Sequence, residues 1–288
     1  MDLELNDEAV KTTGAADAAA RALAGTDGVR VASVMAPGAG AGVRVPVRIY
    51  QADGAPRGWL VWAHGGSWTA GSAAGWHHAT ADLARAASAT VVSVDYRLAP
   101  EHPHPAALLD VLAAMDLALA LTDGPISVGG DSAGATLAAA AALAWRDLGR
   151  PRLAAQVLAY PPIDPAARAA SYHRAPHAHP SRAGLMAAWR AYRGTGERHP
   201  ALTHATPWYS TPAEADDLGG LAPAILAVGT ADPVADDVRG YARRLREAGN
   251  AVTFREFAGA RHGVFLVEPG MRRWLAATYA LTYERSTS

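Results

Sequence analysis

Residues 126–148, ISVGGDSAGATLAAAAALAWRDL, combine a short apolar run, a serine between glycines and an alanine-rich segment of helical character. The central part, Gly130–Gly134, fits the pattern G-x-S-x-G and joins the expected strand to the expected helix. Such a turn leaves no room for a side chain at either glycine and holds Ser132 in a strained conformation, with its hydroxyl exposed. The helix N-terminus then directs the Ala133 amide toward negative charge that develops at the serine. The pattern predicts a nucleophile; the alternative is a glycine-rich turn with an ordinary N-cap serine.

Short apolar runs recur along the chain and alternate with longer segments of helical character. The apolar runs are Trp59–Ala63, Thr90–Asp95, Ile126–Gly130, Gln156–Ala159, Ala224–Gly229 and Val252–Phe257. The helical segments between most of them are Ala73–Ala87, Pro105–Leu121, Ala133–Leu148 and Val234–Ala248. Because only strands buried on both faces tolerate continuous apolar runs, this alternation predicts an α/β fold, with a parallel sheet covered by helices on both faces.

Two regions depart from this alternation. Near the N-terminus, residues 7–24 predict a short helix, and Val29–Met35 and Val43–Tyr50, which a glycine-rich turn joins, predict an antiparallel hairpin. Between residues 161 and 223 no strand pattern occurs, and a structureless loop of that length is rare in a compact domain. We therefore expect an inserted helical piece across the top of the sheet, with Ser181–Tyr192 as its best helix. No repeat or linker divides the chain, so residues 1–288 are expected to form a single domain.

The composition excludes several classes of protein. Basic residues number 26 and acidic residues 27, without the clustered basic excess of a nucleic-acid-binding protein. The lack of cysteine excludes disulfides, thiolate zinc sites and a cysteine nucleophile. The acidic N-terminus is unlike a secretory signal, and no uncharged apolar stretch is long enough to span a membrane, so we expect a cytoplasmic protein without a membrane partner. No cofactor or metal is expected, and a homodimer is left open.

A serine nucleophile needs a base, and the base needs an orienting carboxylate. After a serine on this kind of turn, the partners are expected in the order aspartate, then histidine. Asp232 lies where one predicted strand ends and His262 follows the last strand, so both leave the sheet at the edge where Ser132 lies. We expect His262 to take the serine proton while Asp232 fixes its tautomer. Asp236 and Asp237 compete for the carboxylate role, but they would already lie in the next helix.

The segment His64-Gly65-Gly66-Ser67-Trp68 follows another predicted strand. Paired glycines let backbone amides approach a bound oxyanion closely. Alone, such a segment is equally typical of a flexible loop. With a nucleophile downstream it predicts an oxyanion hole.

Two further sets of charged residues lie near these motifs. Asp131 precedes the nucleophile and is expected to tie neighbouring loops together rather than to transfer protons. Asp95, Arg97 and Glu101 form either a polar network that supports the oxyanion hole or a salt-linked loop without a catalytic role.

Five motifs together carry a resemblance to a known family. In chain order they are HGGSW (64–68), DYRLAPEHP (95–103), GDSAG (130–134), DPVADD (232–237) and HGVF (262–265). Their set, order and spacing resemble the hormone-sensitive-lipase-like (bacterial family IV) esterases of the α/β-hydrolase fold. The resemblance covers most of the chain, from about Trp59 to Phe265.

The resemblance implies a mostly parallel, twisted sheet of about eight strands, with helices on both faces and a cap built from about residues 1–40 and 164–206. It implies the catalytic residues Ser132, Asp232 and His262. The oxyanion donors it implies are backbone amides among Gly65, Gly66, Ser67 and Ala133. Ser67 stands where the family has glycine, and its Cβ narrows the conformational choice of the loop and the room for an acyl or alcohol group.

The activity that the resemblance implies is hydrolysis of small carboxylic esters, with small to medium acyl chains, through an acyl-enzyme. Trp68 and Trp208 are candidate substrate contacts, although core packing is the default for any single tryptophan. An amide or lactone hydrolase, or a tailoring hydrolase of a secondary metabolite, would use the same triad and stays open. A non-catalytic small-molecule receptor on this fold is a further alternative, but such receptors lose the serine or histidine that this chain retains.

Overall fold

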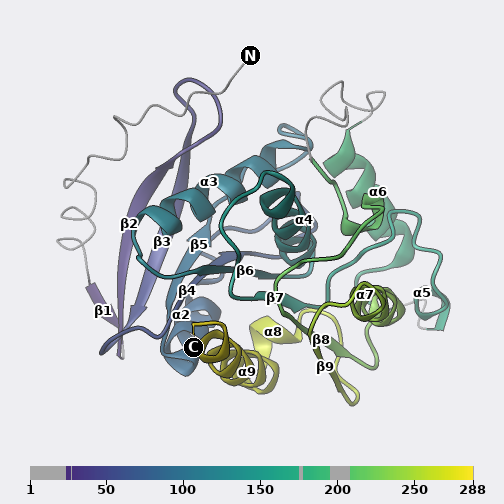
Figure 1. The fold of residues 1–288 in the computed structure, drawn as a ribbon. Helices are drawn as coiled ribbons and strands as arrows, with labels where there is room; N and C mark the ends of the chain where they lie inside the picture. The colour runs from purple at the N-terminus through teal and green to yellow at the C-terminus, as the bar shows by residue number, and fades with distance from the viewer. Residues whose placement is uncertain (1–23, 27, 175–177, 195–207, 288) are drawn as a thin grey trace.

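The computed structural model describes residues 24–26, 28–174, 178–194 and 208–287 (Figure 1). Within these ranges the strands are β1 (Ala24–Thr26), β2 (Val29–Pro37), β3 (Arg44–Ala52), β4 (Trp59–Ala63), β5 (Thr90–Val94), β6 (Ile126–Asp131), β7 (Gln156–Ala159), β8 (Ala224–Gly229) and β9 (Val252–Phe257). The helices are α2 (His77–Ala87), α3 (Ala106–Ala120), α4 (Ala133–Asp147), α5 (Ser171–Arg174), α6 (Arg182–Arg193), the 3₁₀ turn η2 (Pro212–Glu214), α7 (Ala235–Glu247), α8 (Val264–Val267) and α9 (Pro269–Thr287).

The nine described strands form one sheet in the order β1-β2-β3-β5-β4-β6-β7-β8-β9. Strands β1, β2, β3 and β5 pair antiparallel, and every pairing from β5 through β4 to β9 is parallel. The predicted α/β fold with an antiparallel start is confirmed. The sheet has one strand more than the predicted eight because the short β1, which the sequence pattern does not show, pairs with β2 at the edge.

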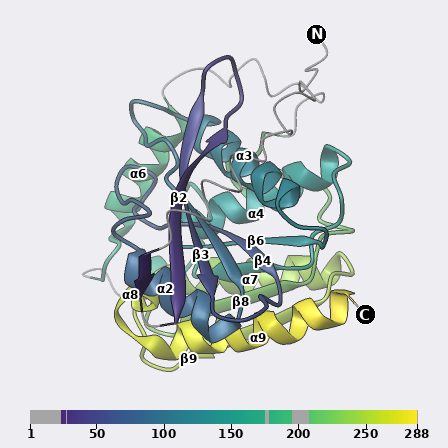
Figure 2. The same cartoon turned by 90° about the vertical axis from the view of Figure 1, so that its left-hand side faces the viewer.

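Helices cover both faces of the sheet. Figures 1 and 2 show α3 and α4 on one face and α2 and α9 on the other, and α2 and α9 also pack on each other. The central strands β6, β7 and β8 are buried along their whole length, which explains their unbroken apolar sequence. β9 lies at the edge of the sheet, and none of its residues is fully buried. None of the described helices is long and apolar enough to cross a membrane.

The inserted piece follows β7. Its best helix is α6, which begins one residue later than predicted because Ser181 is the N-cap, and the Ser181 hydroxyl accepts a hydrogen bond from the Gly184 amide at 3.1 Å. Figure 1 shows α5 and α6 on the side of the molecule opposite β1–β3. No strand occurs in the described part of residues 161–223, in agreement with the prediction.

The N-terminal part of the predicted cap is wrong where the structure tests it. Residues 24–26 and 29–37 form β1 and β2, so they belong to the sheet and not to a cap. β2 pairs with β3 along its whole length and with β1 at its start, which places it inside the sheet. The predicted helix at residues 7–24 lies outside the described residues, apart from Ala24 in β1.

Candidate active site

Ser132 lies at the sharp turn between β6 and α4. Its backbone angles, φ 53° and ψ −123°, are rare for a residue with a side chain. A Cβ on Gly134 would lie 2.0 Å from the Ala63 carbonyl oxygen, and a Cβ on Gly130 would lie 2.4 Å from the Gly134 carbonyl. Both glycines are therefore required by close backbone approach, and the predicted strand–turn–helix arrangement is confirmed.

The side chains of Ser132, His262 and Asp232 form one chain of hydrogen bonds. Ser132 Oγ lies 2.7 Å from His262 Nε2, and His262 Nδ1 lies 2.9 Å from Asp232 Oδ2 and 3.0 Å from Oδ1. A carboxylate only accepts, so Nδ1 carries the ring proton and Nε2 of the neutral imidazole accepts from the serine hydroxyl. This is the arrangement that general-base activation of a serine requires. The structure thus brings together the three residues that the motifs predict.

Asp232 follows β8, and contacts other than the one with His262 also hold its carboxylate in place. The side chain is fully buried, and Oδ1 accepts a hydrogen bond from the Val234 amide at 2.9 Å. The two competing carboxylates, Asp236 and Asp237, lie on α7 and bind backbone amides of the segment after β7 instead. Asp237 Oδ2 accepts from the Ile163 amide at 2.8 Å, and Asp236 Oδ2 accepts from the Ser171 amide, also at 2.8 Å.

Tyr160 supports the histidine and was missed by the sequence interpretation. It follows β7 directly, has a positive φ of 40°, and is fully buried. Its ring centroid lies 4.7 Å from that of His262, and its hydroxyl oxygen accepts from the Phe265 amide at 3.1 Å. Burial raises the pKa of this phenol well above its usual range, so it stays neutral. Its place at the carboxyl end of a parallel strand was the one available signal.

The loop His64–Trp68, here called the oxyanion loop, follows β4 next to the nucleophile. A Cβ on Gly65 would lie 3.3 Å from the Ser132 Cβ, which shows how closely the two backbones approach. In the described part of the chain, no acceptor contacts the amides of Gly66, Ser67 or Ala133. Those three amides are therefore available to an oxyanion bound at Ser132. Catalytic use of these amides remains a proposal.

The prediction that the Gly65 amide is an oxyanion donor stays a prediction. The buried Asp131 carboxylate lies beside the Gly65 backbone, and this neighbouring amide lowers the pKa of the carboxyl group. Asp131 Oδ1 also accepts from the indole nitrogens of Trp76, at 2.9 Å, and Trp62, at 3.3 Å. Asp131 therefore links β4 and the segment before α2 to the turn that carries Ser132, in agreement with the expectation that it ties neighbouring segments together. Burial raises the pKa of Asp131 to about 7, although its three N–H donors oppose this shift.

The segment after β5 supports the oxyanion loop from another side. The Tyr96 hydroxyl donates to the His64 carbonyl at 2.7 Å, and the Asp95 carboxylate accepts from the Ala73 amide at 2.9 Å. Arg97 makes a forked ion pair with the fully buried Asp110, with N–O distances of 2.8 to 3.1 Å. Of the three residues in the predicted network, none contacts the oxyanion loop directly, and the Arg97–Asp110 pair fits the alternative of a salt-linked loop; the contact with the oxyanion loop comes from Tyr96. Glu101 is exposed and takes no part in these contacts.

Neither predicted tryptophan contact lines a cavity beside the serine. Trp68 is fully buried, so the prediction that it contacts substrate is wrong. Trp208 is half-buried, and its carbonyl accepts from His104 Nε2 at 2.9 Å. A cavity of about 450 Å³ lies between the oxyanion loop and α6, and Trp208 is not among its lining residues. Its walls are mostly small side chains: Ser67, Thr69, Ser181, Gly184, Ala187 and Ala188.

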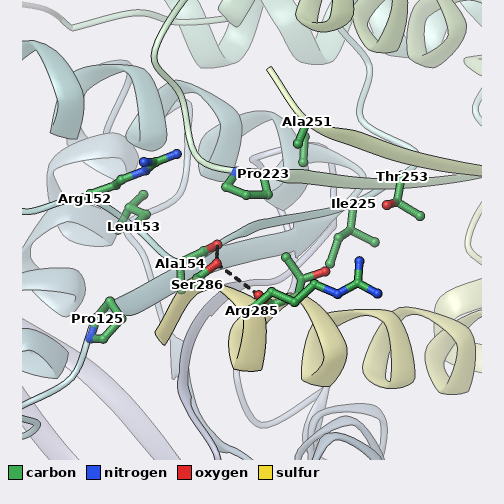
Figure 3. Close-up of a pocket in the computed structure, with 12 residues that line it drawn as sticks. Pro125, Arg152, Leu153, Ala154, Pro223, Ile225, Ala251, Thr253, Arg285 and Ser286 are labelled. Atoms are coloured by element: carbon green, nitrogen blue, oxygen red, sulfur yellow. Dashed lines mark hydrogen bonds between the residues drawn. The ribbon is translucent and has the colours of Figure 1, made fainter. Parts of the chain in front are cut away.

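Another cavity of about 450 Å³ lies at the amino ends of the parallel strands, at the other end of these strands from Ser132 (Figure 3). Its walls include Pro125, Ala154, Pro223 and Ala251, each at or just before the start of a parallel strand. Figure 3 shows the last turn of α9 beside it, where the Ser286 hydroxyl donates to the Ala154 carbonyl at 3.1 Å. Ser132, Asp232 and His262 all follow the carboxyl ends of strands, whereas this cavity lies at the amino ends. It therefore cannot deliver a substrate to these three residues.

Comparisons with known proteins agree with this geometry. A family model described as alpha/beta hydrolase fold matches residues 60–266. An acetyl-hydrolase of Streptomyces hygroscopicus is 38% identical over 208 residues, which are 70% of this chain and 67% of the relative. The carboxylic ester hydrolase LipN of Mycobacterium tuberculosis is 37% identical over 235 residues, which are 76% of this chain but only 60% of LipN.

Solved structures agree along most of the chain. A bacterial heroin esterase superposes with a TM-score of 0.79 at 30% identity, covering 91% of this chain and 86% of that protein. An esterase from the bacterial hormone-sensitive lipase family superposes with a TM-score of 0.78 at 29% identity, again covering 91% and 86%.

Proposed function

This chain belongs to the alpha/beta hydrolase fold family and, within it, to the hormone-sensitive-lipase-like bacterial esterases; on this premise we propose that Ser132, His262 and Asp232 hydrolyse small carboxylic esters. It is a carboxylesterase-type hydrolase by its relatives. The contact of 2.7 Å between Ser132 Oγ and His262 Nε2 is the observation that carries the assignment of its catalytic residues.

In the first half of the reaction, Ser132 Oγ attacks the ester carbonyl carbon while its proton passes to His262 Nε2. The carbonyl oxygen becomes an oxyanion that accepts hydrogen bonds from the amides of Gly66, Ser67 and Ala133. Asp232 stabilises the imidazolium through Nδ1. The tetrahedral intermediate collapses, the alcohol leaves with the proton from His262, and the acyl group remains on Ser132.

In the second half, a water molecule attacks the acyl carbon and gives a proton to His262 Nε2. The same amides hold the new oxyanion. Collapse expels Ser132 Oγ, which regains the proton from His262, and the carboxylic acid leaves. The triad returns to the arrangement seen in the structure, with the imidazole hydrogen-bonded between the hydroxyl and the carboxylate.

We propose small to medium acyl chains for the substrate. The support is the cavity of about 450 Å³ between the oxyanion loop and α6, a volume within the range of small-ligand sites, which Ser67 of the proposed oxyanion hole lines. Ser67 narrows it further, because its side chain lies in the wall where a glycine would leave space. A cytoplasmic location and a homodimer stay predictions.

The test is hydrolysis of p-nitrophenyl acetate, butyrate and octanoate, with the matching anilides and a small lactone as competing classes. We expect acetate or butyrate to be cleaved fastest and Ser132→Ala to abolish turnover. Faster cleavage of an anilide or the lactone would overturn ester specificity. No turnover of any compound, together with saturable binding of an ester, would favour a receptor.

A further inference from the structure

Two consecutive non-glycine residues of the oxyanion loop have a left-handed backbone. Ser67 has φ 55° and Trp68 has φ 60°. For an L-residue this conformation costs about 1–2 kcal/mol, and it persists only where the surrounding structure holds it. The position of the Ser67 amide, a candidate oxyanion donor, therefore depends on contacts that fix Trp68.

Within the loop, the Thr69 and Ala70 amides donate to the Gly66 carbonyl at 3.1 and 3.0 Å and close the turn, and the Trp68 side chain is held by the inserted piece. The Trp68 ring stacks on Tyr192 of α6, with centroids 4.8 Å apart and planes at 12°, and it also meets Trp189 of α6 at 4.2 Å. All three rings are at most 1% exposed. The tryptophan that ends the oxyanion loop is thus packed against one face of the inserted helix.

The two partners of this packing are tied to the same neighbouring segment. The Trp68 carbonyl accepts from the Ala99 amide at 3.0 Å, and the Tyr192 carbonyl accepts from the His104 amide at 2.6 Å. The Tyr192 hydroxyl lies 3.1 Å from His104 Nδ1, within hydrogen-bond distance. The segment from Ala99 to His104 therefore sets α6 at a fixed distance from the oxyanion loop.

The other end of the loop is held by different means. At the start of the loop, the buried Tyr96 hydroxyl donates to the His64 carbonyl at 2.7 Å. The free amides of Gly66 and Ser67 lie between these two anchors. The contact at the start of the loop belongs to the core of the fold, and the packing of Trp68 on α6 belongs to the insertion.

We propose that Trp189 and Tyr192 are positioning residues for the oxyanion hole, acting through Trp68. By packing on Trp68, α6 keeps the left-handed turn of the loop and so directs the Ser67 amide at the oxyanion. The insertion then takes part in transition-state stabilisation besides forming a cavity wall. This inference rests on the proposed ester hydrolysis, since it assigns these rings a part in that reaction.

The decisive variant is Trp189→Leu, assayed with p-nitrophenyl acetate. Loss of one oxyanion donor lowers kcat by about 10² to 10³, so displacement of the Ser67 amide should lower kcat by about tenfold or more while KM changes less than about threefold. The affinity for an alkylboronic acid, whose tetrahedral adduct with Ser132 places an oxygen in the hole, should fall in parallel. Trp189→Phe and Tyr192→Phe retain a ring against Trp68, so these variants should keep most of the wild-type kcat and boronate affinity.

Two control variants separate positioning from loss of stability. Trp145→Leu removes another buried tryptophan, at the far end of α4 from Ser132, and should lower the melting temperature without changing kcat or boronate affinity. Arg190→Ala changes an exposed residue of α6 and should leave the melting temperature, kcat and boronate affinity unchanged. If Trp189→Leu does not fold, Tyr192→Leu provides the same test from the other ring.

The inference is overturned if folded Trp189→Leu or Tyr192→Leu keeps the kcat and boronate affinity of the wild type. It is also overturned if Trp145→Leu loses both in proportion to its melting temperature, because the effect would then be general destabilisation. A wild type that binds the boronate but cleaves no ester would contradict the proposed function, while boronate affinity would still test the positioning of the hole.

Discussion

Replacing Asp232 by asparagine should invert the tautomer of His262. In the wild type, Asp232 Oδ1 accepts from the Val234 amide at 2.9 Å, and Oδ2 lies 2.9 Å from His262 Nδ1. The amide nitrogen of asparagine cannot accept from Val234, so the carbonyl oxygen takes the Oδ1 position and the NH₂ group takes the Oδ2 position. A donor then faces Nδ1 at the Oδ2 position, while the carbonyl oxygen, 3.0 Å from Nδ1, is shared with the Val234 amide, so we expect the ring proton to move to Nε2, against the Ser132 hydroxyl.

The size of the effect follows from this geometry. An imidazole that carries its proton on Nε2 cannot accept the serine proton, which in serine–histidine–aspartate sites lowers kcat by about 10⁴. This corresponds to about 5 kcal/mol in the activation free energy. The fold should remain intact, because the variant has nearly the same volume and keeps the hydrogen bond to Val234.

The assay is steady-state hydrolysis of p-nitrophenyl acetate at pH 8, with circular dichroism to check the fold. Asp236→Asn is the matched control, one turn further on, where the carboxylate pairs with Arg174 and Arg239 near the surface. We expect it to stay within about threefold of the wild type, since exposed ion pairs contribute about 1 kcal/mol or less. The reasoning is refuted if Asp232→Asn keeps a tenth of the wild-type kcat, or if Asp236→Asn loses as much as Asp232→Asn.

Three further predictions concern the surroundings of the triad. Gly134→Ala, whose Cβ would lie 2.0 Å from a carbonyl oxygen, should lower the free energy of unfolding in urea by about 3 kcal/mol, whereas Gly240→Ala, in open space on α7, should not lower it. Burial raises the pKa of Asp131 to about 7, above the usual range of a carboxyl group, so its contribution to stability is present below about pH 4 and is lost as pH rises through 7. The free energy of unfolding in urea should therefore fall more between pH 5 and pH 8 for the wild type than for Asp131→Asn. Ser67→Gly should raise the octanoate-to-acetate ratio of kcat/KM by about threefold or more, because it removes a side chain from the cavity wall; an unchanged ratio would place the acyl group elsewhere.

Local patterns were sufficient for most of the sheet. Strands β4, β7, β8 and β9 have the predicted bounds, because each is a short apolar or alternating run between turn residues. The edge strand β1 was missed, since three residues with glycine in the middle show no alternation. Helix α9 was missed as well, although its buried residues Met271, Leu275, Tyr279 and Tyr283 recur at the four-residue spacing of a helix face.

The triad was predictable because each member follows a strand of a parallel sheet, and strand ends meet at one edge. This argument also separates Asp232 from the α7 carboxylates Asp236 and Asp237, which hold the insertion. Contacts between distant segments were not predictable in this way. Tyr160, whose ring centroid lies 4.7 Å from that of His262, was missed because only the fold brings these two distant residues together.

The contacts of the tryptophans were likewise not predictable from the sequence. A tryptophan beside a catalytic loop fits a substrate wall and a packing contact equally well, and the sequence does not distinguish the two. Trp68 is in the second class because Trp189 and Tyr192, more than a hundred residues later, cover it completely. Only the three-dimensional placement of α6 reveals this.

The central claim is that the hydroxyl of residue 132 carries the acyl group during turnover. The direct measurement is rapid acid quench of the protein with p-nitrophenyl acetate, followed by mass spectrometry of its peptides. We expect one acetyl group on the peptide that contains Ser132, its amount matching the burst of p-nitrophenol, and none in Ser132→Ala. A burst without acetyl on this peptide, or an acetyl group on another residue that persists in Ser132→Ala, would contradict the account.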